Sequence, residues 1–146
     1  MKILICGKGG CGKSTIAAML GKYLAERGLS LLVVDADESN VGLYRMLGLK
    51  KAKALAEWLG GREGLRGNLK ALPTSLGEIP AEVLSRGGNI AALAIGKIEE
   101  PGEGCACPYG LLAREFLKNL KLREGEVALV DTEAGIEHFG RGLCLV

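Results

Sequence analysis

The amino-acid sequence predicts an α/β fold with a mainly parallel sheet, in a single domain that spans residues 1–146. The first 34 residues alternate between a short strand-like run, a glycine-rich loop, a helical pattern and a second strand-like run. That second run, residues 31–34, is apolar throughout, as expected of a parallel strand that is buried on both faces. A length of 146 residues is typical of one domain, and 48% apolar residues are enough to form its core.

The first βαβ unit is expected within residues 2–34. Residues 2–6 form a short β-rich run that stops at a cluster of glycines. From Ser14 onward the apolar side chains recur at helical spacing and make one face, formed by Ile16, Met19, Leu20, Tyr23 and Leu24. The helix is expected to end near Arg27 and Gly28, because a basic residue and a glycine suit a helix C-terminus.

The middle of the chain is expected to form short helices and strands. Short helices are expected between residues 39 and 67, with residues 52–59 as the best candidate and the glycines at positions 60, 61 and 64 as interruptions. Residues 68–72 and residues 91–95 each have the pattern of a strand. Between them, Pro73 and Pro80 bracket a loop or a short helix.

The last part of the chain is expected to form a helix and a buried strand. Residues 97–104 are rich in proline, glycine and glutamate and are expected to form a loop. A helix is expected to begin at Pro108, because proline is favoured in the first turn and Leu112, Phe116 and Leu120 recur every four residues. Residues 127–130 form another apolar run, which ends at Asp131.

A phosphate-binding loop is the strongest functional motif. Residues 7–14 match the pattern G-x-x-x-x-G-K-[ST] and lie between a predicted strand and a predicted helix. Its glycines allow main-chain N–H groups to converge on phosphate oxygens, Lys13 can reach the β- and γ-phosphates, and Ser14 can ligate Mg²⁺. The alternative is a glycine-rich turn that only permits tight packing of the strand on the helix.

A second lysine in this loop, Lys8, gives the pattern K-G-G-x-G-K-S-T. The pattern resembles the deviant phosphate loop of the MinD/ParA/nitrogenase-iron-protein class of dimeric ATPases. The resemblance implies a three-layer P-loop NTPase fold that binds ATP and Mg²⁺ as a homodimer, with Lys8 acting on the partner's nucleotide and Thr15 contacting the α-phosphate. The alternative for Lys8 is a solvated loop lysine. The candidate nucleotide-binding residues are Gly7, Lys8, Gly9, Gly10, Cys11, Gly12, Lys13, Ser14 and Thr15, of which Lys8 and Lys13 are also catalytic candidates.

Three aspartates, Asp35, Asp37 and Asp131, follow predicted strands. They should lie at the carboxyl ends of parallel strands, where α/β sheets bind their ligands. Mg²⁺ needs oxygen ligands, and an attacking water needs an acceptor to orient it. The resemblance places Asp37 beside the attacking water as a catalytic residue, Asp131 near Mg²⁺, and Asp35 in support of the water shell of that ion. The alternative is that these aspartates are helix caps and turn residues.

The pair Cys105 and Cys107 is a candidate metal site. In an extended chain, residues two apart point to the same side, and the helix N-terminus that follows Pro108 favours thiolates. Two ligands do not complete a tetrahedral site, whereas a twofold axis would supply two more. The alternative is a pair of ordinary loop cysteines.

Five cysteines, an odd number in a chain without secretory features, argue against a disulfide framework and favour thiol or metal chemistry. We therefore expect a cytoplasmic protein. The remaining three, Cys6, Cys11 and Cys144, are read as small packing residues or part of the terminus.

Taken together, the phosphate loop, the cysteine pair and residues 131–138 resemble the CooC-type ATPases that mature nickel carbon monoxide dehydrogenase. This resemblance implies Ni²⁺ or Zn²⁺ at Cys105 and Cys107, shared across a homodimer, and carbon monoxide dehydrogenase/acetyl-CoA synthase as the client. The only histidine, His138, falls inside the match, either as a packed polar residue or as a metal ligand. Family members continue beyond the equivalent of residue 146, so we expect the family's C-terminal strands and helices to be missing and ATP turnover to be weak or absent.

Charge and hydropathy exclude other classes of partner. With 19 Lys+Arg against 17 Asp+Glu and only 4% aromatic residues, the chain lacks the basic footprint of a nucleic-acid-binding protein. No apolar run approaches the ~20 residues of a membrane span. Two alternatives stay open: a non-catalytic module that binds nucleotide or metal, and a MinD/ParA-like positioning ATPase.

Overall fold

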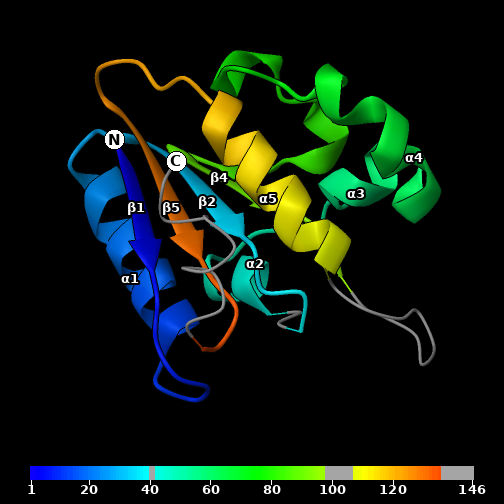
Figure 1. Cartoon of the computed structure of the whole chain (residues 1–146). Coiled ribbons are helices and arrows are strands. Elements are labelled where there is room, and N and C mark those ends of the chain that lie inside the picture. The colour runs from blue at the N-terminus through cyan, green and yellow to red at the C-terminus, as the bar shows by residue number, and fades with distance from the viewer. Residues whose placement is uncertain (40–41, 98–106, 136–146) are drawn as a thin grey trace.

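The computed structural model describes residues 1–39, 42–97 and 107–135. A five-stranded sheet is flanked by helices (Figure 1). Its strands are β1 (Lys2–Ile5), β2 (Ser30–Asp35), β3 (Ser85–Gly87), β4 (Ile90–Ala94) and β5 (Glu126–Asp131). The α-helices are α1 (Lys13–Glu26), α2 (Leu43–Met46), α3 (Leu55–Trp58), α4 (Gly61–Asn68) and α5 (Cys107–Asn119), and three 3₁₀ turns cover Leu69–Ala71, Leu76–Glu78 and Ala81–Val83.

The sheet has the strand order β1-β5-β2-β4-β3. The first four strands in this order are parallel, and only β3 at the edge is antiparallel to its neighbour β4. The predicted α/β class with a mainly parallel sheet is therefore confirmed. β3 escaped prediction because its three residues, Ser85–Gly87, are polar or glycine and show no apolar alternation.

Helices cover both faces of the sheet, which makes three layers. In Figure 1, α1 lies against one face and α5, with α3 and α4 beside it, lies against the other. Successive residues of β2 enter opposite cores: Leu31 and Val33 pack on the α1 side, whereas Leu32 and Val34 pack on the α5 side. Burial on both faces explains why this strand is apolar at every position instead of alternating.

The predicted helix after the phosphate loop is confirmed, but its buried face differs from the expected one. Ile16, Met19 and Tyr23 are each at least half exposed, with exposed fractions of 52%, 68% and 51%. The helix instead buries its small residues Ala17, Ala18 and Gly21 against the sheet. A Cβ added to Gly21 would lie 3.4 Å from Val33 Cγ2, so small residues let the helix axis approach the sheet closely.

Two predictions for the middle of the chain are wrong. Residues 68–72 are not a strand: Asn68 ends α4, Leu69–Ala71 form a 3₁₀ turn, and Leu72 after it enters the core on the α5 side. Short apolar runs suit either a strand or a buried helical turn, and tertiary packing decides between them. Gly64 does not interrupt a helix but lies inside α4. A Cβ there would lie 2.0 Å from the Leu59 carbonyl oxygen, so the close approach of these two segments requires a glycine.

The other predicted helices and strands are confirmed in type, whereas nearly all of the loop expected at residues 97–104 lies outside the described residues. The runs at residues 2–6, 91–95 and 127–130 are β1, β4 and β5, and the helix expected at Pro108 is α5, which begins one residue earlier. The candidate helix at residues 52–59 is shorter, at Leu55–Trp58, and a 3₁₀ turn forms between Pro73 and Pro80. None of the helices in the described part of the chain has both the length and the apolar character that a membrane span requires.

Candidate functional site

The phosphate loop connects β1 to α1 at the carboxyl edge of the sheet. Gly10 and Gly12 have φ angles of 72° and 88°, a region that side chains other than glycine adopt only with strain. The first turn of α1 follows directly, and the Ile16 N–H donates to the Gly12 carbonyl at 2.9 Å. The first N–H groups of an α-helix have no acceptor within the helix, so this end of α1 is suited to an anion.

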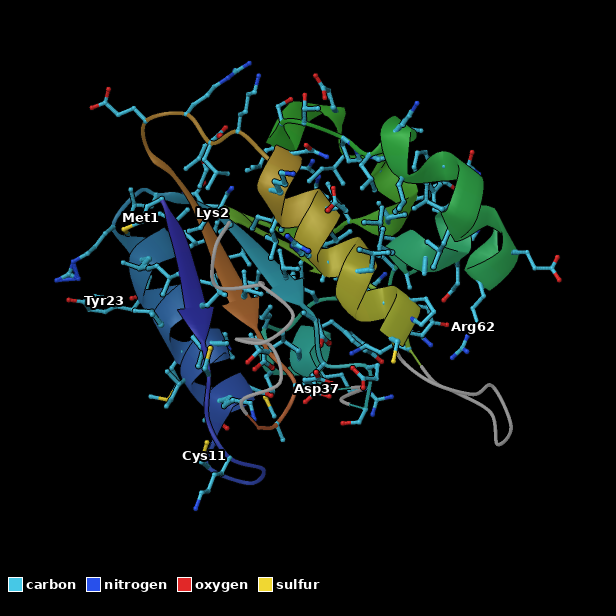
Figure 2. All side chains as sticks on the ribbon, viewed as in Figure 1. Met1, Lys2, Cys11, Tyr23, Asp37 and Arg62 are labelled. Atoms are coloured by element: carbon cyan, nitrogen blue, oxygen red, sulfur yellow. The ribbon has the colours of Figure 1, made fainter. Side chains whose placement is uncertain are left out.

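The two lysines of the loop occupy different environments. Lys13 is only 7% exposed, and its Nζ donates to the Lys8 carbonyl oxygen at 3.4 Å, so its side chain lies back over the loop. The Lys8 side chain is exposed, as is Cys11, whose N–H also donates to the Lys8 carbonyl, at 3.4 Å. Figure 2 shows Cys11 in the loop and Asp37 at the same end of the sheet.

The segment after β5 packs beside this loop. The Gly135 N–H donates to the Gly7 carbonyl at 3.2 Å, and the two residues form an isolated β-bridge. Thr132 is fully buried, and its Oγ1 donates to the Ile5 carbonyl at 2.9 Å. The end of β5 is thereby fixed to the start of the phosphate loop, although more than 100 residues separate them in the sequence.

The strand ends bring the three candidate aspartates to one place, called here the acidic corner: Asp35, Asp37 and Asp131. Asp131 is paired in register with both Ile5 of β1 and Asp35 of β2, and it is fully buried. Asp35 is 7% exposed, and its Oδ1 accepts a hydrogen bond from the Asp37 N–H at 3.3 Å. The acidic corner thus combines two buried carboxyls on adjacent strands with a third in the turn after β2.

Asp35 forms an ion pair with Lys97, whose Nζ lies 2.7 Å from Asp35 Oδ2. Burial raises the pKa of Asp35 to about 6, because the charged form loses its hydration. The Lys97 charge opposes this shift, while the charge of neighbouring Asp131 adds to it.

Asp37 has its carboxylate in a local turn. Its Oδ1 accepts hydrogen bonds from the Ser39 N–H at 2.9 Å and from the Ser39 hydroxyl at 2.6 Å. These contacts are those of an Asx turn, the alternative considered for strand-end aspartates. The catalytic role of Asp37 therefore stays a prediction.

The donor set at this edge suits Mg²⁺. Ser14 in the first turn of α1 supplies a hydroxyl, and Asp35 and Asp131 supply carboxylates. Mg²⁺ prefers oxygen ligands and usually keeps several waters and substrate phosphates in its shell. Within the described residues no group of three or more His, Cys, Asp or Glu side chains is placed to hold a metal, so phosphates and water would have to complete the shell.

The cysteine prediction is only partly covered by the structure. Cys107 is the exposed first residue of α5 and is disulfide-bonded, so a metal at this position requires its reduced form. Cys105, His138 and Cys144 lie outside the described residues. Cys6 and Cys11 are free thiols.

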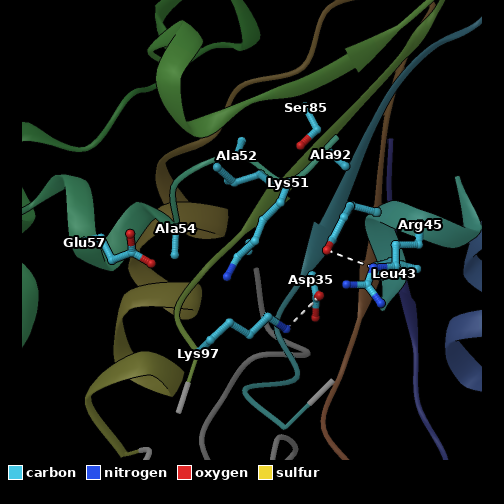
Figure 3. Close-up of a pocket in the computed structure, with 13 residues that line it drawn as sticks. Asp35, Leu43, Arg45, Lys51, Ala52, Ala54, Glu57, Ser85, Ala92 and Lys97 are labelled. Carbon is cyan, nitrogen blue, oxygen red and sulfur yellow. Dashed lines mark hydrogen bonds and ion pairs between the residues drawn. The ribbon is translucent and has the colours of Figure 1, made fainter. Parts of the chain in front are cut away.

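Sequence reasoning missed Lys97 as a site residue. It lies three residues after Ala94, the last residue of β4, whereas Asp35 and Asp131 are the last residues of their own strands. Its place shortly after a strand end, at the edge where the aspartates were expected, was the available signal. Figure 3 shows it beside a cavity of about 170 Å³, next to the acidic corner. Basic side chains from Arg45 and Lys51 also line this cavity, with an apolar wall that includes Leu43 and Leu93.

Comparison with known sequences identifies similar proteins. A family model described as CobQ/CobB/MinD/ParA nucleotide binding domain matches residues 2–98 of the chain. The uncharacterized ATP-binding protein MJ0084 of Methanocaldococcus jannaschii is 51% identical over 154 residues, an alignment that covers 98% of this chain and 62% of that protein. The carbon monoxide dehydrogenase accessory protein CooC of Rhodospirillum rubrum is 36% identical over 152 residues, covering 97% of this chain and 58% of that protein.

Comparison with solved structures agrees on the fold. The septum site-determining protein MinD of Pyrococcus horikoshii, solved with Mg-ADP, superposes with a TM-score of 0.66 at 22% identity. The superposition covers 99% of this chain and 54% of the MinD chain. The chain thus spans about three fifths of the length of the curated relatives described above.

Proposed function

The chain belongs to the CobQ/CobB/MinD/ParA nucleotide binding domain family, and from this membership we propose that it is an ATP-hydrolysing metallochaperone that assists nickel insertion into a carbon monoxide dehydrogenase or acetyl-CoA synthase. The family membership confirms the resemblance predicted from the phosphate loop. The similarity to CooC, over nearly the whole chain, is what points within this family toward metal delivery.

One observation carries the nucleotide part of the proposal: the phosphate loop and the acidic corner lie at the same edge of the sheet. Strand pairing joins the ends of β1, β5 and β2, so the loop that leads from β1 to Lys13 and Ser14 starts at the edge where β2 and β5 end with Asp35 and Asp131. A positive loop beside buried carboxylates is the combination that Mg-ATP requires.

Each residue has a distinct task in the proposed reaction. Lys13 and the N–H groups of the loop bind the β- and γ-phosphates, and they stabilise the charge that develops during phosphoryl transfer. Ser14 and Asp131 would hold Mg²⁺, with Asp35 in support, and the charge that such an ion supplies would offset that of the phosphates. Asp37 orients the attacking water after leaving its turn with Ser39, and the exposed Lys8 reaches the nucleotide of a partner subunit.

The metal part of the proposal rests on Cys105 and Cys107. Each protomer of a homodimer would supply two thiolates, which together make a four-sulfur site for Ni²⁺ or Zn²⁺. Nickel is here the cargo that the client enzyme receives. Because thiolates must lose their protons to ligate, metal affinity should fall as pH decreases, and a reductant must be present to open the disulfide at Cys107.

Steady-state ATP hydrolysis by the chain, as purified under reducing conditions, tests the nucleotide part. We expect the Mg²⁺-dependent turnover of this chain to be weak, and we expect Lys8→Ala to slow it further while leaving ATP affinity unchanged, because the target of Lys8 is the partner's nucleotide. Lys22→Ala, an exposed charge removed from the middle of α1, is the matched control. ATP binding without turnover would instead identify a non-catalytic nucleotide-binding module.

Metal analysis of the reduced protein tests the second part. The wild-type chain should bind about one Ni²⁺ or Zn²⁺ per dimer, and replacing Cys105 and Cys107 together by alanine should abolish it. Replacing Cys6 and Cys11 is the matched control, since both are free cysteines elsewhere in the chain. A monomer that still binds one equivalent of metal would contradict the shared site.

A further inference from the structure

Lys97 is a buried lysine at the candidate nucleotide site. Its side chain is only 7% exposed, and that of its partner Asp35 is 9% exposed. Besides the 2.7 Å ion pair with Asp35, its Nζ donates a short hydrogen bond to the main-chain oxygen of Asp37. A single ammonium group therefore contacts two residues of the acidic corner: the side chain of Asp35, in the ion pair drawn in Figure 3, and the main chain of Asp37.

The position of Lys97 is set by the strand that precedes it. The Ile95 N–H donates to the Asp35 carbonyl at 3.0 Å, which ties the end of β4 to the end of β2. Gly96 then packs against the ring of Tyr109 in the first turns of α5, where an added Cβ would lie 2.6 Å from Tyr109 Cδ1. With no room for a side chain at residue 96, the chain passes close to α5 and delivers Lys97 to the acidic corner.

The positive charge of Lys97 compensates the negative charge of the acidic corner. Asp35 and Asp131 are adjacent buried residues of the same sign, and their mutual repulsion opposes a fixed arrangement. Removing one partner from a buried ion pair leaves an uncompensated charge, and this costs more than the pair itself contributes. Arg45 and Lys51 line the same cavity, but both are exposed, and a solvated charge compensates a buried carboxylate poorly.

We propose that Lys97 is a positioning residue for the Mg²⁺-nucleotide site, where its ammonium holds the Asp35 carboxylate and the Asp37 main chain in fixed positions relative to Asp131. The inference rests on the proposed nucleotide binding and deepens it. Lys97 acts through the aspartates and not on the phosphates, so it should matter for Mg²⁺-dependent affinity and not for the affinity that the phosphate loop provides alone.

The test compares ADP binding by calorimetry in the presence of Mg²⁺ and in the presence of EDTA. The ratio of the two dissociation constants gives the Mg²⁺ enhancement of affinity. We expect Lys97→Met to reduce this enhancement at least tenfold while changing the EDTA value less than twofold. Lys97→Arg keeps the charge and should restore the enhancement to within about threefold of wild type, whereas Lys53→Met, which removes an exposed charge outside the cavity, should leave it unchanged.

A second variant covers failure to fold. Circular dichroism of each variant reports whether it is folded. If Lys97→Met does not fold, Lys97→Gln is tested in its place, because it keeps a hydrogen-bond donor without the charge. We expect Lys97→Gln to reduce the Mg²⁺ enhancement at least threefold. A folded Lys97→Met or Lys97→Gln variant with wild-type enhancement would overturn the inference. Absence of any Mg²⁺ enhancement in the wild-type chain would overturn the proposed nucleotide site as well, so the two failures are distinguishable.

Discussion

The phosphate loop and the acidic corner lie at the same edge of the sheet, but they are built in opposite ways. The loop is one contiguous segment, mostly exposed, in which glycine conformations and a helix N-terminus present main-chain N–H groups. The acidic corner is assembled from the ends of β2 and β5, with Lys97 from beyond β4, and its side chains are mostly buried. The phosphate loop therefore depends on backbone conformation. The acidic corner depends on opposite charges that compensate one another where little water is present.

This difference predicts how each region responds to change. A loop of main-chain donors tolerates a change of pH, but it does not tolerate a Cβ at a left-handed position or loss of its one buried lysine. Buried carboxylates tolerate small changes of shape, whereas their contribution to stability changes with pH.

The largest expected effect is loss of nucleotide affinity in Lys13→Ala. This change removes the buried ammonium that lies over the loop and leaves only main-chain dipoles to bind the phosphates. Charge-assisted contacts to two phosphates lead us to expect an affinity loss on the order of 1,000-fold, or about 4 kcal/mol. Calorimetric titration with ATP measures it, and an unchanged dissociation constant would refute the phosphate-loop assignment.

The next effect is the pH dependence of stability that Asp35 confers. Because burial raises its pKa from 3.8 to about 6, the folded chain binds more protons than the unfolded chain between these values. The free energy of unfolding should therefore decrease as pH rises through this window, by up to about 3 kcal/mol from this group.

Urea unfolding of the wild type and of Asp35→Asn at several pH values between 4 and 7 measures this contribution. The amide cannot titrate, so only the wild type loses this contribution to stability as pH rises. The free energy of unfolding of Asp35→Asn should therefore increase relative to that of the wild type between pH 4 and pH 7. A constant difference across the window would show that Asp35 titrates normally and that the acidic corner is well hydrated.

A smaller effect is expected from a single methyl group in the loop. Gly12→Ala places a Cβ at φ 88°, which should destabilise the fold by about 1–2 kcal/mol and weaken nucleotide binding. Gly67→Ala is the matched control, because that glycine lies in α4 without a positive φ and has open space around a Cβ. The control should be neutral or slightly stabilising, and equal destabilisation in both variants would remove the argument from backbone conformation.

The smallest effect tests the contact that joins the two regions. Thr132→Val keeps the shape of the side chain but removes the Oγ1 donor to the Ile5 carbonyl, which should cost about 1 kcal/mol. ATP affinity should decrease no more than about threefold, since the main-chain ladder between β1 and β5 remains. Chemical unfolding gives the first number and calorimetry the second, and a larger loss of ATP affinity would show that this hydroxyl itself positions the loop.

Much of the fold could be predicted because local signals and burial agree. The runs at residues 31–34 and 127–130 are apolar at each position, as is typical of parallel strands buried on both faces. The buried face of α1 could not be predicted, because the pattern of large apolar residues indicated Ile16, Met19 and Tyr23, whereas the close approach to the sheet required small residues. The strand expected at residues 68–72 is instead the end of α4 and a 3₁₀ turn, because the packing partners that decide its conformation are distant in sequence.

The sequence by itself determined the phosphate loop, since a run of glycines ending in Lys13 and Ser14 between a strand and a helix leaves little for distant residues to decide. It also placed Asp35 and Asp131 at strand ends. Only the tertiary structure decided that β5 inserts between β1 and β2, which makes those two aspartates neighbours, and that Lys97 compensates their charge. The phosphate loop binds through its main chain, so the backbone preferences of a few consecutive residues are enough to form it. The buried ion pair of Asp35 and Lys97 depends on strand order and on exclusion of water, and no local sequence pattern specifies either.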